Sequence, residues 1–198
     1  MRSFHFPGRS PVYGRKAMCA TSHPASTVAA LDVLRAGGNA VDAAIAAAGV
    51  LAVVEPPMTG IGGDCFAIVA PADGRPIMTY NASGWAPATI DADALSAQGR
   101  RIPEASAHAV TVPGAIDGWC TLNATYGTRG LDELLAPAAR IAAEGFRVTG
   151  RVAFDWARHA GRAAATPAGR DQYLPGGRVP VTGDVFRMPA LAQTLRAI

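Results

Sequence analysis

The sequence predicts an α+β domain that is rich in helices and contains a single β-hairpin. Residues 39–56 read as a helix that is apolar on every side after Asp42, and a helix of this kind is buried all round. Two β-prone runs within residues 65–83 flank Asp73-Gly74, which is a strong turn signal. Most of the chain after residue 112 shows helical patterns separated by glycine and proline.

Two helices are expected before the hairpin. Residues 23–38 place apolar side chains at helical spacing, with Ser22 as the expected N-cap and Gly37 at the end. The apolar helix follows at once. Asn39 is expected to cap it and Asp42 to lie near the positive end of its dipole, and two prolines after Glu55 end it.

Further helices are expected after the hairpin, at residues 91–98, 113–127, 131–145, 149–164 and 188–198. The last of these has Leu191 and Leu195 on one face and no C-cap before the sequence stops. This pattern predicts that residues 1–198 are the N-terminal portion of a longer protein.

Composition narrows the classes of function. Hydrophobic residues make up 49% of the chain and charged residues 17%, as in globular proteins. The net charge of +3 comes from scattered residues with no basic block, so nucleic acid is not an expected partner. The longest apolar stretch, residues 43–54, is too short to span a membrane, and no signal peptide is recognised. A cytoplasmic location is therefore expected, with Cys19, Cys65 and Cys120 as buried free thiols.

The stretch Thr-Gly-Ile-Gly-Gly-Asp-Cys at residues 59–65 is the most distinctive local pattern. A dinucleotide fingerprint would need glycine at position 65 and a strand before the loop, and neither condition is met. Gly60, Gly62 and Gly63 are instead expected to turn the chain sharply from the buried helix into a core strand. Asp64 would then either bind backbone amides of the turn or face a substrate.

No catalytic centre emerges from the residues alone. The neighbours Ser22 and His23 diverge at a helix start, and the histidines are too dispersed for a metal motif, so neither a metal nor a cofactor is expected. The carboxylates of Asp117, Asp132 and Glu133 fall on amphipathic helices and are expected to be solvated.

Several spaced motifs, in fixed order over nearly the whole chain, resemble the N-terminal part of the γ-glutamyltransferase (γ-glutamyltranspeptidase) family, including its acylase-like branch. They lie in ATSHPASTVAALDVLRAGGNAVDAAIAAAGVLAVVEPPMTGIGGDCF, in VPGAIDGWCTLNATYGTRGLDELLAPAARIAAEGFRVTG and in YLPGGRVPVTGDVFRMPALAQTLRAI. The resemblance implies an N-terminal-nucleophile (Ntn) hydrolase with an αββα sandwich, of which this chain holds only the helix-rich portion with a β-hairpin. It also implies a precursor that cuts itself into a large and a small subunit.

In such enzymes the new N-terminal Thr of the small subunit is the nucleophile. The resemblance therefore implies that the small subunit is a partner, that the substrate is a small-molecule amide or peptide, and that this chain alone is inactive. The alternative is a truncated or degenerate, non-enzymatic homologue that acts as a binding or structural domain. A Thr within a self-cleavage segment downstream would favour the enzyme.

One departure from the family pattern bears on the substrate. In γ-glutamyl-specific members an Arg, in a pattern like FREMAP, binds the substrate α-carboxylate, whereas alignment on Ala86-Pro87 puts Ser83 at that position. Ser cannot replace the charge of Arg, and Arg75 would compensate only by folding across the hairpin. Ser83, Trp85, Asp64, Gly62 and Gly63 are the expected substrate-binding residues, with Trp85 either lining an acyl pocket or packing in the core.

Overall fold

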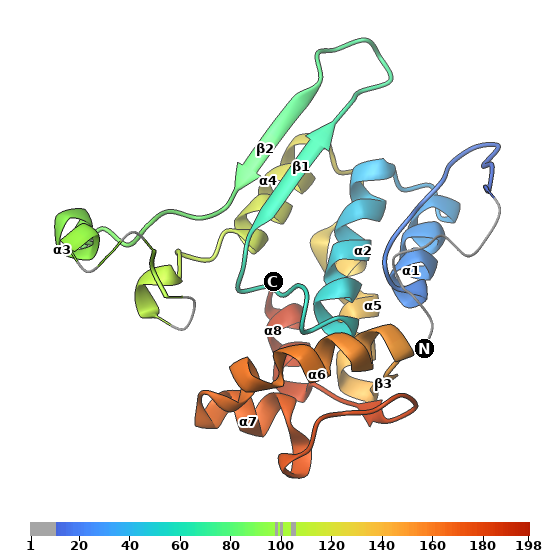
Figure 1. Ribbon diagram of the computed structural model, residues 1–198. Helices are drawn as coiled ribbons and strands as arrows, with labels where there is room; N and C mark the ends of the chain where they lie inside the picture. The colour runs from blue at the N-terminus through green and yellow to red at the C-terminus, as the bar shows by residue number, and fades with distance from the viewer. Residues whose placement is uncertain (1–10, 98, 100, 104–105) are drawn as a thin grey trace.

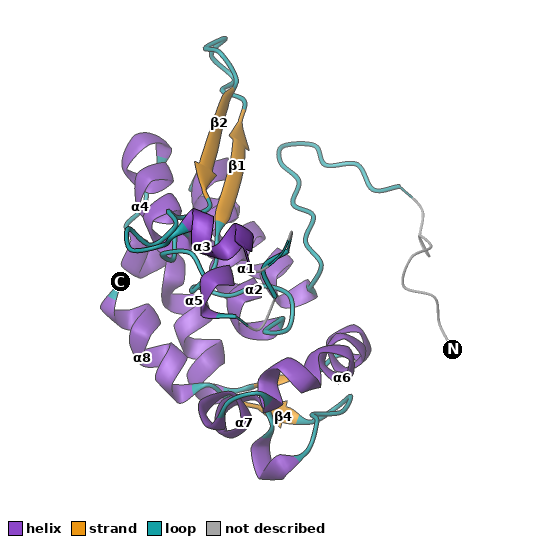
Figure 2. Cartoon of the chain, turned by 60° about the vertical axis from the view of Figure 1, so that its left-hand side comes forward, coloured by secondary structure: helices purple, strands orange, loops and turns teal. Residues whose placement is uncertain are grey.

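The computed structural model describes residues 11–97, 99, 101–103 and 106–198 (Figure 1). The hairpin stands at one end of a helical body, and α6 and α7 gather at the opposite end (Figures 1 and 2). The helices are α1 Pro24–Arg35, α2 Ala40–Val54, α3 Ala92–Ala97, α4 Ala115–Tyr126, α5 Leu131–Glu144, α6 Gly150–Ala164, α7 Pro167–Tyr173 and α8 Pro189–Ala197. The strands are β1 Cys65–Val69, β2 Met78–Ala82, β3 Phe146–Arg147 and β4 Val185–Phe186, and short 3₁₀ turns cover Ala107–Ala109 and Pro175–Gly177.

Helix α2 is the centre of the helical body, as its apolar sequence predicts. It packs against α1, α4 and α5, and α5 in turn packs against α8. A methyl group at Gly49 of α2 would lie 2.8 Å from Leu135 of α5, so glycine permits this close approach. Asn39 caps α2 as predicted, and Asp42 completes a capping box by accepting a hydrogen bond from the Asn39 backbone.

The hairpin pairs β1 with β2 in antiparallel register, with Cys65 opposite Ala82 and Val69 opposite Met78. One face, containing Cys65 and Ala67, packs towards α2 and α4. On α4, a Cβ at Gly118 would lie 2.9 Å from the Cβ of Cys65, so a glycine is needed where helix and hairpin meet. The opposite face of the hairpin is exposed.

A second, two-residue pairing joins β3 to β4 beside α6 and α7. Phe146 and Phe186 pack edge to face across this pair, with ring centroids 6.0 Å apart, and Trp156 of α6 also packs edge to face against Phe186, with ring centroids 4.6 Å apart. The sequence pattern predicted neither this small sheet nor α7. The small sheet joins segments about 40 residues apart, which local patterns do not show. Helix α7 does have a local start signal, the N-cap Thr166 before Pro167, and sequence reasoning missed it.

Two expectations about single residues are wrong. The N-cap of α1 is His23, whose Nδ1 accepts a hydrogen bond from the backbone of Ala25 at 3.2 Å, while the Ser22 hydroxyl donates to Glu55 at 2.6 Å. Of the three cysteines, all free, Cys120 is exposed and the other two are half-buried. Cys120 falls on the outer side of α4, where burial cannot be read from a short apolar context.

Among the described residues, no helix is both long and apolar enough to cross a membrane. The cytoplasmic location stays a prediction.

Candidate functional site

Three segments that lie far apart in the sequence meet at the open end of the hairpin. The carbonyl of Gly63 accepts hydrogen bonds from the backbone amides of Gly114 and Ala115, at 2.9 and 3.0 Å. The backbone amide of Val112 donates to the carbonyl of Trp85 at 2.9 Å. The glycine-rich loop, the segment after β2 and the start of α4 are therefore fastened together.

Two glycines allow the last two segments to cross in contact. Gly84 has a φ of +79°, and a Cβ there would lie 1.8 Å from the carbonyl oxygen of Val112. A Cβ at Gly114 would lie 2.2 Å from the carbonyl oxygen of Ala82. No other residue type fits either position without moving backbone, so the crossing requires glycine on both sides.

The glycines of the loop at residues 59–64 do not have the special backbone conformation that a sharp turn was expected to require. Gly60, Gly62 and Gly63 have no positive φ, and a Cβ at Gly60 or Gly62 would meet nothing within 4 Å. The loop does lead from α2 into β1, but neither backbone conformation nor packing within the described residues demands glycine there. The expected reason for these glycines is therefore wrong.

A hollow of about 520 Å³ opens beside the crossing. Its lining residues come from the end of β2 and from the start of α4: Asn81, Ala82, Ser83, Gly84, Trp85, Val112, Pro113, Gly114 and Asp117. Of the expected site residues, Ser83 and Trp85 line the hollow. Gly62, Gly63 and Asp64 do not line it, but the loop that holds them is bonded to the start of α4 through Gly63.

Trp85 is 86% exposed, so packing in a core is the wrong one of its two expected roles in this chain. Arg75 does not reach the hollow, because it pairs with Asp73 at 2.8 Å in the turn at the other end of the hairpin. The place that the resemblance gives to an arginine therefore has no substitute cation among the lining residues.

Sequence reasoning missed Asp117 as a residue of the hollow. As expected, its side chain is exposed, but it lies in the first turn of α4 and lines the hollow together with Ser83 and Trp85. The Pro113-Gly114 pair at the start of a helical pattern was the available signal, since it marks where the chain turns towards the hairpin.

Neither Cys65 nor Ser22 is arranged as a nucleophile. Burial raises the pKa of the Cys65 thiol, and the neighbouring carboxylate of Asp64 adds to the effect, so the thiolate is disfavoured. The Ser22 hydroxyl donates to Glu55 rather than to an imidazole. Asp64 itself is exposed, and no described residue donates a hydrogen bond to its carboxylate.

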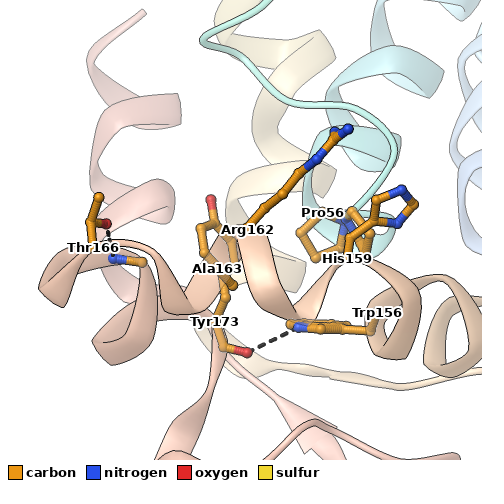
Figure 3. A pocket seen from close by; sticks show the side chains of 9 residues that line it. Pro56, Trp156, His159, Arg162, Ala163, Thr166 and Tyr173 are labelled. Atoms are coloured by element: carbon orange, nitrogen blue, oxygen red, sulfur yellow. Dashed lines mark hydrogen bonds between the residues drawn. The ribbon is translucent and has the colours of Figure 1, made fainter. Parts of the chain in front are cut away.

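A separate hollow of about 350 Å³ lies between α6, α7 and the prolines that end α2 (Figure 3). The indole of Trp156 is fixed at its base by donating from Nε1 to the carbonyl of Tyr173 at 3.0 Å. Nδ1 of His159 lies 2.9 Å from the carbonyl of Asp155 and must carry the proton there, because a carbonyl only accepts. No motif singled out in the sequence contributes to this hollow beyond its prolines.

In the part of the chain that the structure describes, no three His, Cys, Asp or Glu side chains lie close enough together to bind a metal ion.

The family model for gamma-glutamyltranspeptidase matches residues 26–198. Acylase ACY 1 proenzyme of Pseudomonas sp. (strain SE83) is 37% identical over 180 residues, which cover 86% of this chain and 32% of the relative. The crystal structure of cephalosporin acylase from Bacillus halodurans matches with a TM-score of 0.83 and 38% identity, over 99% of this chain and 39% of that one. Helicobacter pylori gamma-glutamyltranspeptidase matches with a TM-score of 0.86 and 30% identity, over 93% of this chain and 54% of that one.

These matches confirm the predicted fold class, a helix-rich α+β portion of the Ntn-hydrolase type. The chain spans about a third of the length of the curated relatives it matches.

Proposed function

Because this chain belongs to the gamma-glutamyltranspeptidase family, we propose that residues 1–198 form the N-terminal part of the large subunit of a self-processing amide hydrolase or acyltransferase. Relatives that are themselves named proenzymes support a processing step. The observation that carries the proposal is the hollow that the segments around Ser83 and Asp117 form within the matched region, next to the glycine-rich loop that is hydrogen-bonded to the start of α4 through Gly63.

The proposed chemistry is acyl transfer through a threonine of the small subunit. Its hydroxyl oxygen attacks the amide carbonyl, its own α-amine takes the hydroxyl proton, and the amine product leaves with a proton. Water or an amine then attacks the resulting ester and restores the threonine. This chain supplies one side of the acyl pocket through Ser83 and Trp85, with Gly62, Gly63 and Asp64 beside it. By itself it is predicted to be inactive.

The acyl group is proposed to differ from γ-glutamyl. A substrate carboxylate is best held by an arginine fork, whereas Ser83 offers a single hydroxyl and Arg75 is held by Asp73. Glutathione-like donors are therefore expected to be poor substrates, and other acylated amines better ones.

The small subunit is proposed to cover the exposed side of the hairpin. Phe66 is 64% exposed and Ile68 77%, and both project from the face of β1 that turns away from α4. Among the residues that the structure describes, each hairpin strand also has one unpaired edge. Because unpaired edges and apolar faces favour association with another strand, this surface suits a partner that continues the sheet.

Mass spectrometry of the intact protein from its native source tests the proposal. Two chains, the smaller beginning with Thr, are expected. A single mass near 20.3 kDa would contradict processing and favour the non-enzymatic alternative. Efficient hydrolysis of γ-glutamyl p-nitroanilide by the full-length protein, undiminished in Ser83→Ala, would refute the substrate argument while leaving the enzyme class intact.

A further inference from the structure

The hollow at the hairpin carries a single formal charge, and that charge is negative. Among its nine lining residues, Asp117 alone is ionisable in the physiological range. In the part of the chain that the structure describes, no Lys, Arg or His forms a salt bridge with it. An unneutralised carboxylate repels a second carboxylate and attracts a cation.

Trp85 adds a second feature that favours a cation. Its indole is 86% exposed and lines the same hollow as Asp117. The face of an indole ring carries negative electrostatic potential and attracts ammonium groups, most strongly where water is excluded. A carboxylate and an open indole together form a recognition pair for a protonated amine, with the ring accommodating the methylene groups next to the nitrogen.

The surrounding backbone holds this pair in place. The hydroxyl of Thr111 donates to the carbonyl of Ser83 at 3.0 Å, and the backbone amide of Ser83 donates to the side-chain oxygen of Asn81 at 3.0 Å. Where the two segments cross, at Gly84 and Gly114, their backbones are in direct contact. The segment that presents Trp85 is thus fixed relative to the helix that presents Asp117, so little ordering is needed on binding.

We propose that the hollow binds a protonated amine of the acyl group, with Asp117 as the charge partner and Trp85 as the aromatic surface. This inference rests on the proposed amide hydrolase function, and it names the substrate class: acyl groups that end in an ammonium group rather than in a carboxylate. Ser83 and Asn81 line the same hollow, and their hydroxyl and side-chain carbonyl oxygens can accept hydrogen bonds from the remaining ammonium protons.

Three chromogenic donors of equal length test the charge preference in the full-length protein. They are the p-nitroanilides of 5-aminopentanoate, hexanoate and glutarate, which end in an ammonium group, a methyl group and a carboxylate. The expected order of kcat/KM is ammonium, then methyl, then carboxylate, with about a tenfold difference between the first and the last, which is the size of a partly exposed ion pair gained or opposed. Asp117→Asn should lower kcat/KM for the ammonium donor about fivefold and leave the methyl donor within twofold.

Asp132→Asn is the matched control, because Asp132 occupies the first turn of α5 and does not line the hollow. It should leave all three values unchanged. Fastest turnover of the carboxylate donor, or an equal effect of Asp117→Asn on all three donors, would overturn the inference while leaving the amide hydrolase function standing.

Calorimetric titration separates the two levels of the proposal if none of the donors is cleaved. Butylammonium should bind the full-length protein, and butyrate should not, and Asp117→Asn should abolish the difference. Butylammonium binding without turnover would support the amine site and count against the hydrolase. Equal binding or no binding of the two ions would overturn the amine site.

Discussion

Replacing Asp42 with Asn should destabilise the fold strongly, because Asp42 is fully buried and accepts four hydrogen bonds. Oδ2 accepts from the backbone of Asn39 at 2.9 Å and from the hydroxyl of Thr128 at 2.5 Å. Oδ1 accepts from the backbone amides of Thr128 and Arg129, at 2.9 and 3.4 Å. The carboxylate thus joins the start of α2 to the loop between α4 and α5.

The magnitude follows from counting these bonds. Asn keeps one acceptor oxygen, so the amide group that replaces the second oxygen opposes two donors. Each hydrogen bond to a buried charge contributes about 1.5–3 kcal/mol. The Thr128 hydroxyl can rotate to accept from the new amide, which recovers about 1 kcal/mol. The net cost is about 3 kcal/mol, which corresponds to a fall in Tm of roughly 6–12 °C for a domain of this size.

The effect should also depend on pH. Burial raises the pKa of Asp42, but the hydrogen bonds from Thr128, Asn39 and Arg129 outweigh it, so the pKa of this carboxyl lies below its ordinary value. Its stabilising contribution is therefore present above a pH of about 3.9 and is lost as the pH falls through the lower folded-state value. The difference between wild type and Asp42→Asn should shrink in acid.

Urea denaturation followed by circular dichroism, at neutral pH and down to the acid limit of folding, measures both quantities. Asp32→Asn is the control, because its carboxylate is 62% exposed and forms only a surface pair with Arg35, which contributes at most about 1 kcal/mol. A cost below about 1 kcal/mol for Asp42→Asn, or a cost that is constant with pH, would refute the reasoning.

Two further substitutions test the junction and the start of α1. Gly84→Ala should lower the free energy of unfolding by about 3 kcal/mol or more, since Cβ would lie 1.8 Å from the Val112 carbonyl oxygen. The control Gly74→Ala, also at positive φ but with nothing within 4 Å, should lower it by about 1 kcal/mol. Equal urea midpoints for the two variants would contradict this. Burial lowers the pKa of His23 more than Glu55 raises it, so protonation favours the unfolded state and stability should fall as the pH drops below about 6.5. His23→Asn keeps an N-cap and should flatten that fall, and an unchanged slope between pH 7.5 and 5.5 would count against the assignment.

Most helices could be predicted because their signals are local. Asn39 with Asp42, the glycines after α4 and α5, and the apolar spacing of α5 all act within a few residues of the elements that they define. The predicted N-cap of α1 was wrong because a contact between distant residues decides which side chain caps the helix. The Ser22 hydroxyl donates a hydrogen bond to Glu55, more than 30 residues away, so the side chain of His23 caps the helix instead.

The candidate site was predictable only in part. Ser83 and Trp85 came from comparison with a family motif, and the structure places both in the hollow. Asp117 looked like one of several solvated helix carboxylates, and only the crossing of two distant segments distinguishes it. The crossing depends on Gly84 and Gly114, whose partners are backbone atoms about 30 residues away. No local pattern contains that information.

Hydrogen bonds at both ends of α4 fix the position of Asp117. At each end the partner lies at the start of α2 or in the loop that follows it. At the far end of α4, Asp42 holds the loop around Thr128, and the side-chain amide of Asn39 donates to the carbonyl of Tyr126. At the near end, Gly63, in the loop that follows α2, accepts from Gly114 and Ala115. Helix α2 is the most deeply buried helix, and hydrogen bonds attach both ends of α4 to the segments next to α2. The start of α4, which lines the hollow, is therefore held rigidly against the core. The carboxylate in the first turn of α4 is therefore held in position by Asn39, Asp42 and Gly63, none of which lines the hollow. Such support from residues around a site is what allows one exposed carboxylate to discriminate between substrates.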